Sequence, residues 1–272
     1  MITLIPTGGL ANRMKAIDSA ILMAHHLSAK LRIFWFRDTG LNCRFDQLFQ
    51  PLEIPGVELI EASTSDLLLY DRPRKKNLWT PRLYQKFAFD ACIYVEEATR
   101  LYREHFDFKQ WAANKNVYLA SCIYFYPDEG KRFQPFRPIK PLALQIEEGS
   151  KRFSSDTIGI HIRRTDNIAS IQQSPIELFI AEMRVAIATN IRANFYLASD
   201  SVADKERLKE LFGQRIITSD QAADRNSLEG MQNALVELWL LSKTNRIIGS
   251  AQSSFSETAA EISGIECRIV RK

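Results

Sequence analysis

Two adjacent arginines, Arg163 and Arg164, directly follow an apolar segment in the sequence His161-Ile162-Arg163-Arg164-Thr165-Asp166. A guanidinium group keeps its charge at any working pH, and its planar fork of N–H donors matches the oxygens of a phosphate. The pair is therefore suited to neutralising a phosphate or a diphosphate. The alternative is a surface loop in which both arginines pair with nearby acids. The position of the pair at the end of a predicted strand favours phosphate recognition.

Four serines lie in the segment Gly249-Ser250-Ala251-Gln252-Ser253-Ser254-Phe255-Ser256, between a predicted strand and a predicted helix. Hydroxyl groups and the first backbone amides of a helix both donate hydrogen bonds to anions. We expect Ser253 or Ser254 to cap the helix, with Glu257 in a capping box. Because capping needs one serine and not four, the segment predicts that a diphosphate uses the remaining donors.

A glycine-rich turn, Gly8-Gly9-Leu10-Ala11-Asn12-Arg13, follows the first apolar segment and opens the first helical pattern. Backbone amides at such a turn, together with the helix dipole, favour an anion. The spacing does not match the Gly-x-Gly-x-x-Gly fingerprint of dinucleotide-binding proteins. Glycines that only permit a tight turn between strand and helix are the alternative.

A single carboxylate, Glu237, lies in the mostly apolar helical segment Glu237-Leu238-Trp239-Leu240-Leu241-Ser242. A carboxylate can accept hydrogen bonds from the two adjacent N–H groups on the Watson–Crick edge of guanine, and adenine does not offer that pair. Glu237 is therefore a candidate for reading a guanine base. The alternative is an exposed acid on the polar face of an amphipathic helix.

Motifs of several other enzyme classes are absent from the chain. It contains no Gly-x-x-x-x-Gly-Lys-Ser/Thr loop, no His-Glu-x-x-His pair and no Asp-x-Asp motif. Close pairs of cysteines suited to a structural zinc are also missing. We therefore expect neither a metal nor an organic cofactor, and two arginines can neutralise a diphosphate where other enzymes use a metal ion. The four cysteines are Cys43, Cys92, Cys122 and Cys267.

Composition and charge limit the partners of the protein. The 272 residues carry a net charge of +4 with basic and acidic residues interspersed, so a nucleic-acid partner is not implied. No apolar run approaches the roughly 18 residues that a membrane-spanning helix needs. The first residues lack the basic and apolar regions of a signal peptide, and we expect a cytoplasmic protein.

Strand and helix patterns alternate along the chain and carry these motifs. The first 36 residues indicate strand, helix and strand, and a second series of strands and helices runs through residues 157–263. Proline density in 127–141 marks a candidate linker. We predict an α/β protein with two Rossmann-like domains, 1–140 and 141–272, that face each other across a cleft. Ligands of such sheets gather at the carboxyl ends of the strands.

Taken together, these motifs resemble those of the fucosyltransferase superfamily, which joins α1,2-, α1,6- and protein O-fucosyltransferases and includes the rhizobial nodulation enzyme. The family motif His-x-Arg-Arg-x-Asp is matched by residues 161–166 and its Ser/Thr-Ser-Phe-Ser motif by residues 253–256. A stretch ending in Ala-Ser/Thr-Asp is matched by residues 195–200, and the opening Gly-Gly-x-x-Asn by residues 8–12. Order and spacing agree as well, whereas residues 37–150 match no family pattern.

The resemblance implies a two-domain GT-B fold, GDP-fucose as the donor, inversion at the anomeric carbon and no metal requirement. It implies that Arg163 holds the β-phosphate and stabilises the departing GDP, while Arg164 and Asp166 shape the loop. The backbone of His161 would approach guanine, which Glu237 would read. Asn12 would face the fucose or the β-phosphate, and Asp200 would order the cleft wall or contact the nucleotide. Ser253, Ser254 and Phe255 would meet the phosphates and the ribose. Gly9 completes the implied donor site.

Two departures from the family bear on this expectation. The chain is short and lacks the stem and membrane anchor of the Golgi members, which suits a bacterial cytoplasmic enzyme acting on a glycan or a lipid-linked saccharide. Arg13 stands where several relatives have glutamine. No general base is identified. A transferase for another nucleotide sugar and a non-catalytic nucleotide-binding protein of the same fold are the alternatives.

Overall fold

The computed structural model of the protein describes residues 1–71, 80–126, 132–164, 167–219 and 224–272. The chain divides into two compact units, Met1–Arg137 and Pro138–Lys272. Each unit contains one five-stranded sheet. Asp166 lies outside the described residues, so the role predicted for it stays a prediction.

The first unit begins with a buried strand, a glycine turn and a long helix. β1 (Ile2–Pro6) is buried along its whole length, as its continuous apolar sequence predicts for the centre of a parallel sheet. α1 (Leu10–His26) starts two residues after Gly8, whose φ of +83° lies in the region that favours glycine. The other elements are β2 (Leu31–Trp35), a 3₁₀ turn (Phe45–Gln47), β3 (Val57–Glu61), α2 (Thr64–Leu67), α3 (Thr80–Ala88), β4 (Ala91–Ile93), α4 (Val95–Arg103), α5 (Phe108–Ala112) and β5 (Val117–Ser121).

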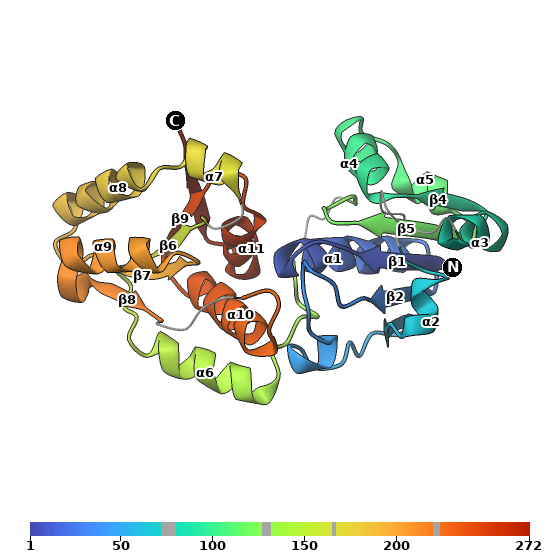
Figure 1. The fold of residues 1–272 in the computed structure, drawn as a ribbon, viewed down its shortest axis with the longest axis horizontal. Helices are drawn as coiled ribbons and strands as arrows, with labels where there is room; N and C mark the ends of the chain where they lie inside the picture. Colours follow the sequence, from blue (N-terminus) through green and yellow to red (C-terminus); the bar gives the residue numbers. More distant parts are fainter. Residues whose placement is uncertain (72–79, 127–131, 165–166, 220–223) are drawn as a thin grey trace. The chain divides into compact units, whose positions relative to one another are not determined.

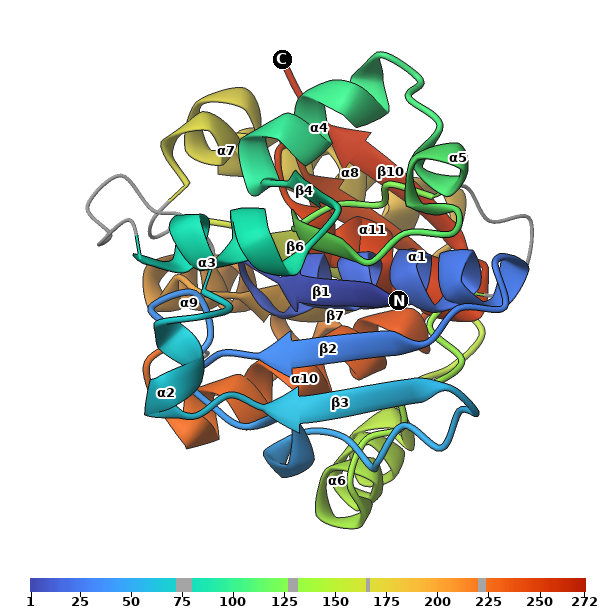
Figure 2. The same cartoon turned by 90° about the vertical axis from the view of Figure 1, so that its right-hand side faces the viewer.

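The sheet of the first unit has the strand order β3-β2-β1-β5-β4, with all pairings parallel. Figure 2 shows β1, β2 and β3 side by side and pointing the same way, so their carboxyl ends share one edge. α1 packs against β1 and β2. The chain continues from β1 to β2 on one side, whereas β5 flanks β1 on the other, so the turn after β1 lies at the topological switch point.

The second unit opens with a helix and then alternates strands and helices. Its central strand, β6 (Thr157–Ile162), is buried throughout and carries the predicted arginine loop at its carboxyl end. The other elements are α6 (Lys140–Ser150), α7 (Ile168–Gln173), α8 (Ile176–Thr189), β7 (Asn194–Ser199), α9 (Val202–Phe212), a 3₁₀ turn (Gly213–Arg215), β8 (Ile216–Thr218), α10 (Leu228–Ser242), β9 (Arg246–Ser250), α11 (Ser254–Ser263) and β10 (Glu266–Val270).

The two faces of β6 meet different neighbours, because side chains alternate along a strand. Ile158, Ile160 and Ile162 belong to a core cluster that includes side chains of α8 and α9. Gly159 packs against α10, and the His161 ring stacks on a side chain of α11. Figure 1 shows α8 and α9 on one side of this sheet and α10 and α11 on the other.

The strand order of the second sheet is β10-β9-β6-β7-β8, with parallel pairings throughout. β6 is central, the chain proceeds outward through β7 and β8 on one side, and β9 and β10 follow on the other. The carboxyl ends of β6 and β9 therefore border the switch point, where ligands of such sheets bind. The prediction of an α/β protein with two Rossmann-like sheets is confirmed.

The sequence patterns do not predict three of the strands, β3, β4 and β10. All three lie at the edge of a sheet. β4 has only three residues, and β3 and β10 are largely half-buried or exposed with charges among their apolar residues. An edge strand needs little apolar surface, so its sequence does not stand out from that of a loop.

Within the described ranges, no helix combines the length and the apolar character needed to cross a membrane. In the same residues, no three His, Cys, Asp or Glu side chains are grouped in a way that holds a metal ion.

Candidate functional site

Hydrogen bonds join the loops that follow β6 and β9. The backbone N–H of Arg163 donates to the Ser250 hydroxyl at 3.0 Å, and the same hydroxyl donates to the backbone carbonyl of His161 at 3.2 Å. The amide of Asn167 donates to the carbonyl of Gln252 at 2.9 Å. Both halves of the predicted phosphate site, the arginine loop and the serine segment, therefore meet at one place.

Two carboxylates from the next strand and helix hold the arginine loop. Arg163 Nη1 donates to Asp200 Oδ2 at 2.5 Å, and the other oxygen of Asp200 accepts the backbone N–H of Arg164 at 2.8 Å. Arg164 Nε donates to Asp204 Oδ2 at 2.8 Å. Asp204 lies in the first turn of α9, where the Ser201 hydroxyl accepts its backbone N–H. Asp200 thus fixes both the side chain of one arginine and the backbone of the other.

The arginine loop is only partly exposed. The side chains of Arg163 and Arg164 are 16% and 13% exposed. A guanidinium has five N–H donors, which is more than a single carboxylate accepts. Ion pairs in such a partly buried position are screened less by water and salt than surface pairs. The loop presents cationic charge in a fixed geometry.

The serine segment differs in detail from the prediction. Ser253 occupies the N-cap position of α11, but its side chain makes no capping hydrogen bond. The predicted capping box with Glu257 is wrong, because the third helical residue is Ser256. Ser253 and Ser254 are half-buried and stand at the start of the helix.

The other two serines of the segment have internal roles. Ser250 is fully buried in the contacts with the arginine loop. Ser256 is also fully buried and packs so closely on Gly249 that a Cβ there would approach the Ser256 hydroxyl to 2.3 Å. Of the four serines, Ser253 and Ser254 are therefore the two that can reach a ligand.

His161 links the central strand to α11. Its ring stacks on Phe255 with 4.9 Å between ring centroids and 28° between ring planes. Burial lowers the pKa of His161 to about 4; the charge of Asp200 opposes this shift, and the charge of Arg163 adds to it. The ring is therefore neutral at pH 7 and holds Phe255 by packing. The predicted contact of the His161 backbone with a ligand has a competitor, since Ser250 already binds its carbonyl.

Glu237 is buried and not an exposed acid, so the sequence-based alternative for it is wrong. Its side chain is 7% exposed and pairs with Lys205 Nζ at 3.5 Å through Oε1. Burial raises the pKa of Glu237 to about 7, an effect that the Lys205 charge opposes and the Asp200 charge assists. Burial, with the Glu237 charge in addition, also raises the pKa of Tyr196.

The glycine turn of the first unit is built around Arg13, which the sequence marks as a departure from the family but to which it assigns no role. Arg13 is fully buried and donates through Nε to the carbonyl of Gly8 at 2.9 Å and through Nη2 to Asp38 Oδ1 at 2.9 Å. Its Nη1 bonds the carbonyl of Phe36, and its guanidinium lies 4.9 Å from the centroid of the Trp35 ring. Arg13 therefore ties the turn after β1 to the loop after β2.

Asn12 lies directly over the turn. A Cβ on Gly8 would come within 3.0 Å of the Asn12 side-chain nitrogen, and the positive φ of Gly8 adds to the need for glycine. Gly9 is the N-cap of α1 in an extended conformation and has no side chain to cap the helix. The first backbone amides of α1 are thus left for other acceptors.

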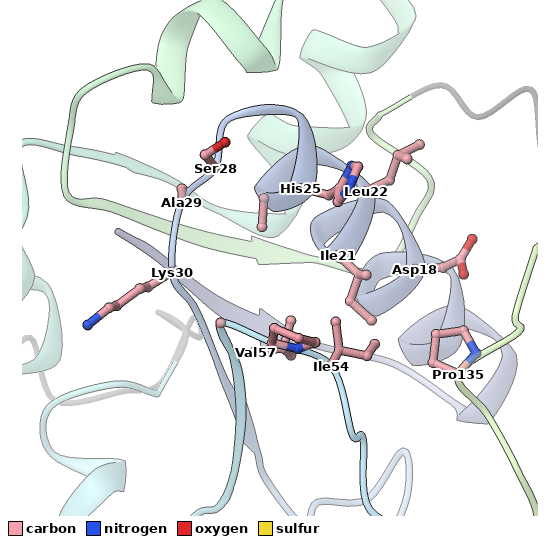
Figure 3. Close-up of a pocket in the computed structure, with 13 residues that line it drawn as sticks. Asp18, Ile21, Leu22, His25, Ser28, Ala29, Lys30, Ile54, Val57 and Pro135 are labelled. Atoms are coloured by element: carbon pink, nitrogen blue, oxygen red, sulfur yellow. The ribbon is translucent and has the colours of Figure 1, made fainter.

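A separate surface pocket of about 600 Å³ lies on the first unit (Figure 3). Its lining includes Ile21 on α1 and residues just before β2 and β3, such as Lys30 and Gly56. Figure 3 shows the Lys30 side chain pointing away from the apolar floor. The pocket lies at the amino ends of these strands, at the edge opposite the glycine turn, and contains none of the predicted site residues.

Within the second unit, hydrogen bonds and ring contacts connect the predicted residues His161, Arg163, Arg164, Asp200 and Phe255. Gly9 and Asn12 belong to the first unit and stay a separate prediction. Sequence reasoning missed two residues that hold the site, Asp204 and Lys205, because both lie on the polar helix α9. Ser250 was singled out as part of the serine segment, but it holds the arginine loop.

Comparison with solved structures identifies the fold. The fucosyltransferase NodZ from Bradyrhizobium matches at 19% identity, and an NodZ α-1,6-fucosyltransferase structure soaked with GDP-fucose has a TM-score of 0.68, covering 96% of this chain and 92% of that chain. POFUT1 in complex with GDP matches with a TM-score of 0.58 at 13% identity, covering 99% and 98% of the two chains. Arabidopsis thaliana FUT1 in complex with GDP matches with a TM-score of 0.60 at 16% identity, covering 98% and 69%.

No family model and no curated protein sequence matches the chain. At identities below 20%, the structural likeness establishes the fold, which is the GT-B fold of these fucosyltransferases. The resemblance seen in the sequence motifs is thereby confirmed for the architecture.

Proposed function

We propose that the protein is a glycosyltransferase that transfers fucose from GDP-fucose to a hydroxyl group of a glycan or a lipid-linked saccharide. The observation that carries this proposal is the arginine loop, fixed at the switch point of the second sheet by Asp200 and joined to the serine segment through Ser250. It supplies fixed positive charge beside the start of a helix, as a departing diphosphate needs. The relatives of the same fold include one soaked with GDP-fucose and others bound to GDP.

In this proposal the second unit binds the donor. Arg163 binds the β-phosphate, Arg164 and Asp166 shape the loop, and Ser253, Ser254 and Phe255 meet the phosphates and the ribose. The burial of Glu237 suits the reading of a base, because a hydrogen bond to guanine discriminates best where water is excluded. In the first unit, Asn12 would face the fucose or the β-phosphate, and Gly9 would belong to the same donor site.

The reaction is a single displacement with inversion. The acceptor oxygen attacks the anomeric carbon of fucose while the bond from that carbon to the β-phosphate oxygen breaks, and the bonding electrons leave with GDP. The acceptor proton passes to a general base. Arg163 stabilises the charge that develops on the diphosphate, so the chemistry proposed here needs no metal ion.

Nucleotide binding separates this function from its alternatives. In excess chelator, GDP is expected to raise the melting temperature more than UDP or ADP, because only guanine offers the N–H groups that Glu237 accepts. A ligand at about 100 times its Kd stabilises a protein by about 2.7 kcal/mol. Glu237→Gln is expected to reduce the preference for GDP. Transfer is then measured with GDP-fucose and a panel of glycans.

Three results would redirect the proposal. A larger shift with UDP or ADP than with GDP would indicate a different nucleotide-sugar donor. GDP binding without transfer or hydrolysis over a broad acceptor panel would indicate a non-catalytic nucleotide-binding protein. A requirement for a divalent cation would contradict the role given to the arginines.

A further inference from the structure

Lys205 is a buried lysine without a role in the proposed reaction. It lies on α9, its side chain is 8% exposed, and its ammonium donates to the carbonyl of Ser219 at 2.8 Å and contacts Glu237 at 3.5 Å. One ammonium thus connects α9, the end of β8 and α10. Burying a lysine costs free energy unless its charge is paired, so a specific use for it is expected.

The two oxygens of the Glu237 carboxylate differ in their hydrogen bonding. Oε1 faces Lys205, whereas Oε2 makes no hydrogen bond to any residue that the structure describes. The hydroxyl of Tyr196, buried nearby on β7, likewise has no hydrogen-bond partner in the described chain. A buried carboxylate held by one oxygen, with the second oxygen unused, is arranged to accept hydrogen bonds from a ligand.

We propose that Lys205 is a specificity-determining positioning residue, which keeps Glu237 ionised and oriented so that its carboxylate can accept the N–H groups of guanine. This inference rests on the proposed function, because it assumes that the nucleotide is a guanosine diphosphate. Lys205 does not touch the base in this proposal and acts only through Glu237.

The ionisation state matters because a protonated carboxyl group carries a donor where guanine also presents donors. Burial raises the pKa of Glu237 to about 7, with the Lys205 charge holding it down and the Asp200 charge pushing it up. Lys205 lies on α9, and Asp200 directly follows β7, which packs against α10. Without Lys205 the carboxyl group is expected to be mostly protonated at pH 7.

The test measures GDP affinity by calorimetry between pH 6 and pH 9. Wild-type affinity is expected to rise with pH around 7, and the Glu237→Gln variant supplies the reference, since it retains the titration of the diphosphate itself. Lys205→Met is expected to shift the rise upward by about one pH unit and to bind GDP about fivefold to tenfold more weakly at pH 7. Near pH 9 most of the lost affinity is expected to return. Lys205→Arg is expected to behave like the wild type.

A matched control lies on the same helix. Lys209 pairs with Glu206 at 3.0 Å in a more exposed position, so Lys209→Met is expected to leave the pH profile unchanged. Circular dichroism checks that each variant is folded. Infrared titration of the glutamate carboxyl in the ligand-free protein gives a second measurement, in which Lys205→Met raises the midpoint of Glu237.

The outcomes distinguish the inference from the function on which it rests. If a folded Lys205→Met variant has the wild-type pH profile, or loses affinity equally at every pH, the positioning role is wrong although GDP binding stands. If the infrared midpoint of Glu237 does not move, the inference also fails. If the wild type binds no GDP at any pH, the proposed function and this inference are both overturned.

Discussion

The two units place arginines at or just after equivalent turns, and these arginines have different partners. In both, a loop follows the central strand of a parallel sheet at the switch point. In the first unit Arg13 is fully buried and bonds the backbone of its own turn, together with Asp38. In the second unit Arg163 and Arg164 remain partly exposed and form ion pairs with Asp200 and Asp204.

The difference shows that a partner set, and not the residue type, decides what an arginine does. The N–H groups of Arg13 donate to backbone carbonyls and to a buried carboxylate, so its charge stabilises the fold. The carboxylates of Asp200 and Asp204 hold the loop of the second unit while the guanidinium groups stay near the surface. The proposed binding of the donor diphosphate uses only the second arrangement.

The largest expected effect is on stability, from Arg13→Met. Methionine keeps much of the apolar stem but leaves Asp38 buried without its ion-pair partner, and breaking such a pair costs about 3–5 kcal/mol. Urea denaturation measures the loss in the free energy of unfolding. Hydrogen exchange localises it, with faster exchange expected in β1 and α1 and unchanged exchange in β6. Equal acceleration in both units would break the contrast.

The same substitution in the second unit, Arg163→Met, is expected to affect activity more than stability. If Arg163 stabilises the departing diphosphate, its removal lowers kcat by about 10²–10³, or about 3–4 kcal/mol. The expected loss of folding stability is about 1–2 kcal/mol, because the backbone of Arg164 still bonds Asp200. Transfer kinetics and urea denaturation of one preparation give both values.

A control for Arg163→Met is Arg192→Met, since the exposed Arg192 side chain pairs with Asp156 outside the arginine loop. Neither transfer nor stability should change by more than about 0.5 kcal/mol. Full activity of Arg163→Met would show that Arg163, like Arg13, has a structural role and does not stabilise the departing diphosphate.

Much of this architecture was predictable because it is local. Alternation along β6 and helical spacing along α10 both lie within a few residues, and they place the arginine loop at a strand end without any tertiary information. The strand ends converge because parallel strands in one sheet share an edge. The part of the site that depends on strand position was therefore accessible from sequence.

The remaining features depend on partners that are distant in sequence. Arg13 bonds Asp38, 25 residues away, and Lys205 meets Glu237 across 32 residues. Lys205 lies in a stretch of α9 rich in charged residues, whose pattern predicts a solvent-exposed face. Nothing in either local pattern separates a buried charge from an exposed one, because burial is decided by what packs on top.

A smaller effect is expected from acid at His161, near the end of β6. Burial holds the pKa of His161 at about 4 in the folded protein, against 6.5 in its ordinary state. Folding therefore favours the neutral ring, and the stability that this contributes is present above pH 6.5 and is lost as the pH falls toward 4. A difference of about 2.5 pKa units corresponds to about 3 kcal/mol at most.

Urea denaturation of His161→Phe between pH 4 and pH 7 checks this expectation. The variant keeps an aromatic ring for Phe255 and removes the titrating group, so its acid-dependent loss of stability should be smaller than that of the wild type. His25→Gln, at an exposed position of α1, serves as the control and should keep the full loss. An unchanged acid response of His161→Phe would show that other groups govern it.

The hydrogen bond between Arg163 and Ser250 closes 87 residues of chain, and that between Arg163 and Asp200 closes 37. Contacts of such long range require loop closure, whose cost in conformational entropy rises with loop length. While β9 is still inside the ribosome, a nascent chain cannot form the contact between the arginine loop and the serine segment. A ligand that needs both segments can therefore bind only after the second unit is complete.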